Sequence, residues 1–126
     1  MNMIPEKIST RFRIGIIGPG SICVTYGNAL KASDTVSLAC ICGRDTEKGR
    51  KTAERFQVPY YTDQEQMYRN EALDGVLICT PTYTHEEMVR RALARRGWSP
   101  TFICESAGTQ AEDALEMQRI YQSYLV

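Results

Sequence analysis

Short apolar runs rich in β-branched residues alternate with longer amphipathic segments along this chain. The runs at 11–17, 36–42, 58–61, 76–79 and 101–105 have the length and composition of buried strands. Strands that alternate with helices in this way are typical of βαβ units, which form a parallel sheet. With right-handed crossovers, the pattern predicts a single α/β domain whose doubly wound, mainly parallel sheet has the strand order 3-2-1-4-5.

Side chains that can accept a hydrogen bond from a free backbone N–H mark the expected helix starts. The capping-box spacing occurs at Thr62 and Glu65, at Thr84 and Glu87, and at Thr109 and Glu112. We expect Asp45 to cap the helix that continues to Phe56.

The charge balance gives no electrostatic bias toward a partner. Lys plus Arg number 15 and Asp plus Glu number 15, so the net charge is zero and no polybasic surface for nucleic acid or anionic lipid is expected. No apolar run approaches the roughly 20 residues of a membrane span. Residues 1–10 form an N-terminal arm without the apolar core of a signal peptide. We therefore expect a cytoplasmic protein that binds neither nucleic acid nor a membrane.

The cysteines are expected to be buried thiols. The chain has an odd number of them, in no C-x-x-C pair, and each lies among apolar residues: Cys23, Cys40, Cys42, Cys79 and Cys104. With a single histidine in the chain, this spacing predicts no metal site.

The segment from Gly18 to Cys23 follows the first predicted strand and opens a helix. Gly18 allows a tight turn there. Gly20 allows the backbone to approach a pyrophosphate, which the helix N-terminus then stabilises. Cys23, a small residue, stands where the third glycine of G-x-G-x-x-G would be. The motif predicts phosphate binding, with a purely structural turn as the alternative.

The end of the second strand lacks the carboxylate that usually binds an adenosine ribose. Gly43 and Arg44 stand there instead. A guanidinium suits a ribose 2′-phosphate, so this position favours NADP over NAD. Asp45 is the competing NAD-type candidate, and an ordinary exposed residue is the other interpretation of Arg44.

The segment after the fourth strand faces the same edge of the predicted sheet. Thr80 and Thr82 offer hydroxyls, and Pro81 is placed to line the nicotinamide side. His85 is expected in the first turn of a helix, where the dipole disfavours its protonated form. We interpret His85 as a neutral, hydrogen-bonded packing residue, with general acid or base as the alternative.

Three segments in this order and spacing carry a resemblance to a known family. Arg13 to Ser21, Asp74 to His85, with its T-P-x-x-x-H motif, and Cys104-Glu105 resemble the N-terminal domain of the Gfo/Idh/MocA oxidoreductases. That family includes glucose-fructose oxidoreductase and inositol dehydrogenase. The resemblance implies an NAD(P)-binding Rossmann domain over residues 11–126. In intact members, hydride passes to or from a sugar-like or polyol substrate.

The resemblance also implies which residues contact the cofactor. They are Gly18, Gly20, Ser21 and Ile22 at the pyrophosphate, Gly43 and Arg44 at the adenosine ribose, and Thr80, Pro81 and His85 at the nicotinamide side, with Glu105 from the strand-five signature. That signature is E-K-P in the family, and its lysine contacts substrate and cofactor. Here Ser106 and Ala107 replace the lysine and the proline. A hydroxyl supplies neither the charge nor the proton of a lysine, so the catalytic residue is left unassigned.

The second, substrate-binding domain of the family is absent from these residues. We therefore expect a truncated member or an excised cofactor half, which alone has no surface complementary to a transition state. The alternatives are a non-catalytic NADP-binding or regulatory protein, a CoA-binding Rossmann domain, and a structural protein. Apolar surface left by the missing domain predicts a homo-oligomer. The candidate contacts are Tyr121, Tyr124, Leu125 and Val126.

Overall fold

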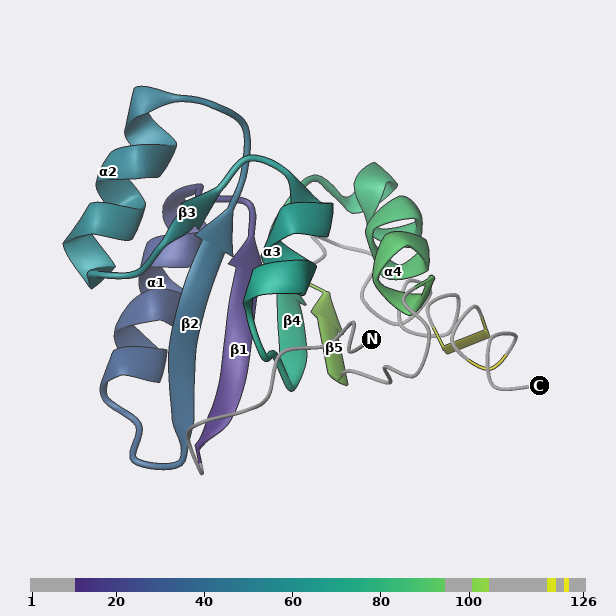
Figure 1. Cartoon of the computed structure of the whole chain (residues 1–126), viewed down its shortest axis with the longest axis horizontal. Helices are drawn as coiled ribbons and strands as arrows, with labels where there is room; N and C mark the ends of the chain where they lie inside the picture. The colour runs from purple at the N-terminus through teal and green to yellow at the C-terminus, as the bar shows by residue number, and fades with distance from the viewer. Residues whose placement is uncertain (1–10, 95–100, 105–117, 120–121, 123–126) are drawn as a thin grey trace.

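The computed structural model describes residues 11–94, 101–104, 118–119 and 122. In these residues a parallel sheet has the order β3-β2-β1-β4-β5, which confirms the predicted topology. Helices α1 and α2 cover one face of the sheet, and α3 and α4 cover the other (Figure 1). The domain is therefore doubly wound.

The elements follow one another in strict βα alternation over most of the described chain. In order they are β1 (Phe12–Ile17), α1 (Ser21–Lys31), β2 (Val36–Cys42), α2 (Glu47–Phe56), β3 (Tyr60–Tyr61), α3 (Gln64–Asn70), β4 (Gly75–Ile78), the 3-10 helix η1 (Thr82–Thr84), α4 (His85–Leu93) and β5 (Thr101–Cys104). None of the described helices combines the length and apolar character needed to cross a bilayer.

Two apolar layers hold the central strands between the helices. On one side Met67 of α3 and Val89 of α4 are buried against the sheet, and on the other Cys23 of α1 and Phe56 of α2 are buried. All residues of β4 are buried. Central strands of a parallel sheet are covered on both faces, which is why they appear in the sequence as continuous apolar runs.

The third strand is shorter than predicted, because the residue at its expected start belongs to the end of α2. Gln57 adopts the left-handed conformation, with φ of 57°. The N–H of Gln57 donates to the Glu54 carbonyl at 3.0 Å, and that of Val58 donates to the Ala53 carbonyl at 3.1 Å. These bonds close the helix by a left-handed cap, so Val58 precedes β3.

The predicted cap of α2 is wrong by one residue. Thr46 is the N-cap, and its Oγ1 accepts from the Gly49 N–H at 3.0 Å. Asp45 instead accepts from the Arg50 guanidinium at 2.8 Å. Thr46 is the last residue with extended backbone, so its side chain is the one that reaches the free N–H groups.

The predicted capping box at Thr62 is also wrong. Asp63 is the N-cap of α3, and its Oδ1 accepts from the Glu65 N–H at 2.9 Å. Thr62 lies one residue outside the cap position and is exposed.

Thr84 is the N-cap of α4 as predicted, but its hydroxyl does not cap the helix. The Oγ1 of Thr84 donates to the Pro81 carbonyl at 2.6 Å, because η1 leads directly into α4 and leaves Thr84 in helical conformation. The predicted box at Thr109 lies outside the described residues, as do the N-terminal arm and the candidate oligomer contacts.

Three of the four thiols whose burial the structure describes follow the prediction, and the fourth is only partly covered. Cys23, Cys40 and Cys42 are buried and Cys79 is half-buried, and all four are free. Burial raises the pKa of Cys23 and of Cys42 to about 11. These buried side chains are therefore neutral packing groups at physiological pH.

Candidate functional site

Gly18 joins the ends of three strands at the carboxyl edge of the sheet. Its φ of 105° lies in the left-handed region that favours glycine. A Cβ on Gly18 would lie 2.9 Å from the Cys79 carbonyl carbon and from the Thr80 nitrogen, which are backbone atoms at the end of β4. The Gly18 N–H also donates to the Cys42 carbonyl at the end of β2, at 2.8 Å. Only glycine allows this close approach.

Gly20 leaves space at the N-terminus of α1. It is the N-cap, no side chain caps the helix, and the first turn contains no acidic residue. A Cβ built on Gly20 would meet no atom within 4 Å. The first N–H groups of a helix lack intrahelical partners and carry partial positive charge, so they attract anions. The exposed Ser21 and the half-buried Ile22 follow directly. This cradle fits a phosphate or pyrophosphate.

Gly43 brings the end of β2 against the glycine loop, which is the segment from Gly18 to Gly20. A Cβ there would lie 2.8 Å from Pro19 Cγ and 2.7 Å from the Tyr60 hydroxyl. The Gly43 N–H donates to the Tyr61 carbonyl at 2.9 Å, which continues the pairing of β2 with β3. The absence of a side chain therefore allows the chain just before Arg44 to lie against Pro19, which stands between Gly18 and Gly20.

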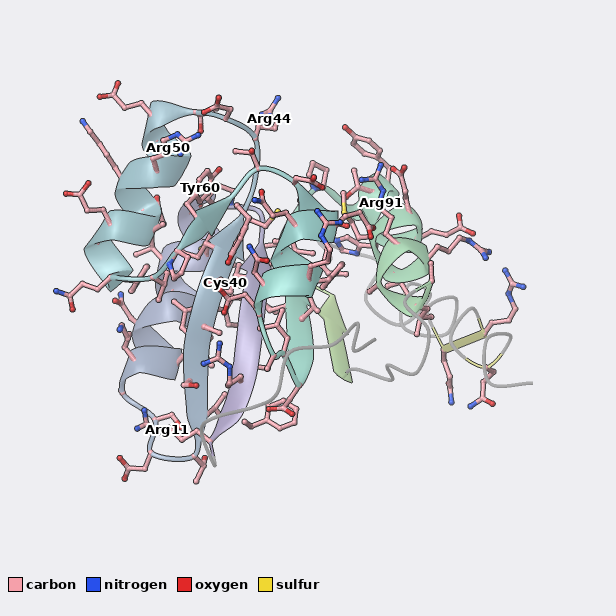
Figure 2. The ribbon with its side chains drawn as sticks, viewed as in Figure 1. Arg11, Cys40, Arg44, Arg50, Tyr60 and Arg91 are labelled. Carbon is pink, nitrogen blue, oxygen red and sulfur yellow. The ribbon has the colours of Figure 1, made fainter. Side chains whose placement is uncertain are left out.

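Arg44 is exposed, and within the described residues its guanidinium forms no ion pair or hydrogen bond. The neighbouring Asp45 is engaged, because its Oδ1 accepts from Arg50 Nη2 at 2.8 Å and from Arg50 Nε at 3.1 Å. The Arg50 guanidinium lies 5.6 Å from the centre of the Tyr60 ring. Figure 2 shows Arg50 and Tyr60 beside α2, and Arg44 on the loop that joins β2 to α2.

The segment after β4 is held by a chain of short hydrogen bonds. The hydroxyls of Thr80 and Thr84 lie 2.6 Å apart, and that of Thr84 donates to the Pro81 carbonyl. His85 Nε2 lies 3.0 Å from the Thr80 carbonyl oxygen, and the residue is only 1% exposed. Because a carbonyl accepts, His85 Nε2 is the donor. This burial supports the packing interpretation of His85: it holds the loop from beneath, and Pro81 remains exposed.

The structure brings most of the predicted site residues to one edge of the sheet. The glycine loop, the Gly43–Arg44 turn and the Thr80–Pro81 segment meet at the carboxyl ends of β1, β2 and β4, where doubly wound folds bind their ligands. His85 lies below this surface. Glu105 and Ser106 lie outside the described residues.

Sequence reasoning missed two residues at the site, Arg50 and Tyr60. Arg50 follows Asp45 by five positions, and their contact depends on how the chain enters α2. Tyr60 is fitted against two glycines, since a Cβ on Gly43 or on Gly49 would collide with its hydroxyl. The sequence did offer one signal of this packing, which is Gly49 in the first turn of α2. Glycine is disfavoured inside helices, so its presence there indicates a close contact with another residue.

The family model described as oxidoreductase family, NAD-binding Rossmann fold, matches residues 12–124. The chain belongs to the Gfo/Idh/MocA family. The predicted family, fold class and dinucleotide-binding function are thereby confirmed.

Two relatives and one solved structure illustrate the family. The chain is 30% identical over 118 residues to the rhizopine catabolism protein MocA of Rhizobium meliloti, covering 93% of this chain and 36% of that protein. It is 33% identical over 78 residues to myo-inositol 2-dehydrogenase of Thermotoga maritima, covering 61% of this chain and 23% of that protein. An oxidoreductase of Agrobacterium radiobacter, crystallised with NAD+, L-tartaric acid and magnesium, has the same fold. Its TM-score is 0.75 at 24% identity, covering 93% of this chain and 34% of that one.

The chain thus spans about a third or less of the length of these relatives. What it shares with them is the Rossmann domain that binds the dinucleotide.

Proposed function

We propose that this chain is the cofactor-binding half of an oxidoreductase and that it binds NADP in preference to NAD. The observation that carries the proposal is the open cradle at Gly20, where α1 begins without a cap. The N–H groups of Ser21 and Ile22 would hold the pyrophosphate there. The preference for NADP rests on Arg44, whose cation is available, next to Asp45, which is paired.

The residues after β4 would line the nicotinamide. In this proposal Thr80 and Pro81 contact the ring side, and His85 fixes the loop by its bond to the Thr80 carbonyl. The family's strand-five signature assigns Glu105 to cofactor binding as well. When bound, the nicotinamide supplies or accepts a hydride. The name of one relative, myo-inositol 2-dehydrogenase, supports a sugar-like or polyol substrate for the whole enzyme.

Titration calorimetry with NADPH, NADH and CoA in parallel tests this proposal. We expect NADPH to bind more tightly than NADH, and CoA to give no heat of binding. Arg44→Met should weaken NADPH about tenfold or more, by loss of a charge-assisted contact, and leave NADH nearly unchanged. Arg91→Met is the matched control, because Arg91 is an exposed arginine on α4 that pairs only with Glu87 among the described residues. Binding of CoA alone would refute the proposal.

The lysine of the family's E-K-P signature is replaced by Ser106, which favours binding without turnover. We expect that this chain alone does not reduce NADP+ in the presence of myo-inositol. The measurement is the absorbance of NADPH at 340 nm. Reduction in proportion to protein concentration would contradict a non-catalytic role.

The location and the assembly state belong to the same proposal. Free cysteines in the described residues support a cytoplasmic location, where thiols stay reduced. A homo-oligomer is expected from the apolar C-terminal residues, and a single monomer peak in sedimentation velocity at high concentration would contradict it.

A further inference from the structure

The Arg50–Asp45 ion pair lies beside the proposed ribose site and contributes little to the fold. The Arg50 and Asp45 side chains are 54% and 74% exposed. Exposed pairs of this kind add only about 0–1 kcal/mol to stability. The pair does, however, engage two of the charges next to Gly43, so that they are not available to bind a ligand.

The Arg50 guanidinium lies over the ring of Tyr60. The Tyr60 ring is seated against Gly43 and Gly49, and its hydroxyl donates to the Arg44 carbonyl at 2.5 Å. Burial raises the pKa of Tyr60, so the hydroxyl keeps its proton at neutral pH. With Arg50 over this ring, its Nη2 donates to Asp45 Oδ1 at 2.8 Å.

Three charges of two signs therefore meet at the end of β2. Arg44 alone is unpaired among the described residues, while Asp45 and Arg50 neutralise each other. An unpaired carboxylate at this place would accept bonds from the ribose hydroxyls of NAD and would repel the 2′-phosphate of NADP. The Arg50 contact opposes both effects.

We propose that Arg50 is a specificity-determining residue, which favours NADP by pairing with Asp45 and so leaves Arg44 as the free charge at the ribose. This inference rests on the proposed function. It differs from the alternative that Arg50 itself contacts the phosphate, because it assigns the effect of Arg50 to Asp45. The two explanations predict different results in a double-mutant cycle.

The test is the ratio of NADPH to NADH affinity, measured by calorimetry on the full chain at low ionic strength. Low salt is needed because exposed charges are screened beyond about 10 Å at 0.1 M. Arg50→Met keeps an apolar stem over Tyr60 and removes the charge. We expect the ratio to fall about tenfold, which is about 1.4 kcal/mol of selectivity. Arg91→Met, the same substitution at an exposed paired arginine on α4, should leave the ratio unchanged.

The double variant Arg50→Met with Asp45→Asn distinguishes the explanations. If Arg50 acts through Asp45, removing the carboxylate restores the ratio to within about twofold of the starting protein. A ratio that stays low in the double variant would assign Arg50 to the phosphate and overturn the inference. An unchanged ratio in Arg50→Met would overturn it as well. Asp45→Asn alone, in which no cation is lost, should keep or increase the preference for NADPH.

The failure of this inference is distinguishable from that of the proposed function. If the unsubstituted chain binds neither dinucleotide, the proposed function fails, and the inference with it. If that chain binds both and the ratios of the variants do not follow the cycle, only the inference fails. Circular dichroism of each variant confirms that the compared proteins are folded, and Arg50→Gln provides a second neutral substitution.

Discussion

Alanine substitutions at Gly18 and Gly20 should separate the fold from the ligand site. The two glycines lie two positions apart in one loop, yet an added methyl group meets opposite surroundings. At Gly18 it would lie 2.9 Å from two backbone atoms, in a conformation with φ of 105°. At Gly20 it would meet nothing within 4 Å, and φ of −86° suits any residue.

The magnitudes follow from these surroundings. Positive φ costs alanine about 1–2 kcal/mol, and backbone atoms at 2.9 Å cannot rotate away, so we expect Gly18→Ala to cost about 2–4 kcal/mol. For a domain of this size that lowers Tm by roughly 10 °C. For Gly20→Ala, a weaker N-cap and a less flexible unfolded chain offset each other to within about 0.5 kcal/mol. The methyl group would still occupy the space proposed for the pyrophosphate and weaken NADPH binding about tenfold or more.

Urea denaturation followed by circular dichroism gives the stabilities, and calorimetry with NADPH gives the affinities. The expected pattern is an unstable Gly18→Ala variant and a stable Gly20→Ala variant that binds poorly. If Gly20→Ala binds NADPH as tightly as the unsubstituted chain, the cradle is not the phosphate site. If Gly18→Ala is as stable as the unsubstituted chain, the close approach to β4 is not required.

Three further predictions concern caps and titrating groups. Asp63→Ala should lower the free energy of unfolding in urea by about 1 kcal/mol through loss of the α3 cap, and Thr62→Ala should leave it nearly unchanged. If Thr62→Ala were the more destabilising of the two, the capping box predicted at Thr62 would be correct. Burial and the bond to Glu71 raise the pKa of Tyr61 from 10.0 to about 12, so its contribution to the free energy of unfolding is full below pH 10 and is lost between pH 10 and 12. Tyr61→Phe should reduce that alkaline loss, and an identical pH profile would refute the assignment. Since burial raises the pKa of Cys42 to about 11, peptide mass spectrometry should find it alkylated slowly at pH 8 and rapidly in urea, and equal rates would contradict its burial.

The central strands were predictable because burial on both faces leaves a continuous apolar signal, and their order then followed from right-handed crossovers. Val76 and Ile78, for example, are fully buried. The start of β3 was not predictable in this way. Val58 is apolar and half-buried, but it follows a left-handed cap at Gln57, a residue type without the conformational freedom that marks such caps. Hydrophobicity alone does not distinguish the end of a helix from the start of a strand.

The helix starts show a second limit of spacing rules. Asp45 and Thr46, like Thr62 and Asp63, are neighbours that both carry an acceptor. Which of the two caps the helix depends on where the extended backbone ends, and that is set by the packing of the helix on the sheet. The structure selects the second residue of each pair.

The proposed cofactor preference shows why a binding site is not described by its sequence motif alone. The sequence pattern points to one cation, Arg44, and to its acidic neighbour, Asp45, as competing signals, and their spacing does not rank them. In the structure a third charge, Arg50, pairs with Asp45 while its guanidinium lies over the ring of Tyr60, which packs against two glycines. In the proposed function, selectivity for the 2′-phosphate is a property of the unpaired charge at the end of β2. Which charge is unpaired depends on tertiary contacts, so the inference drawn for Arg50 assigns cofactor selectivity to a side chain that acts through its neighbour and not through the cofactor.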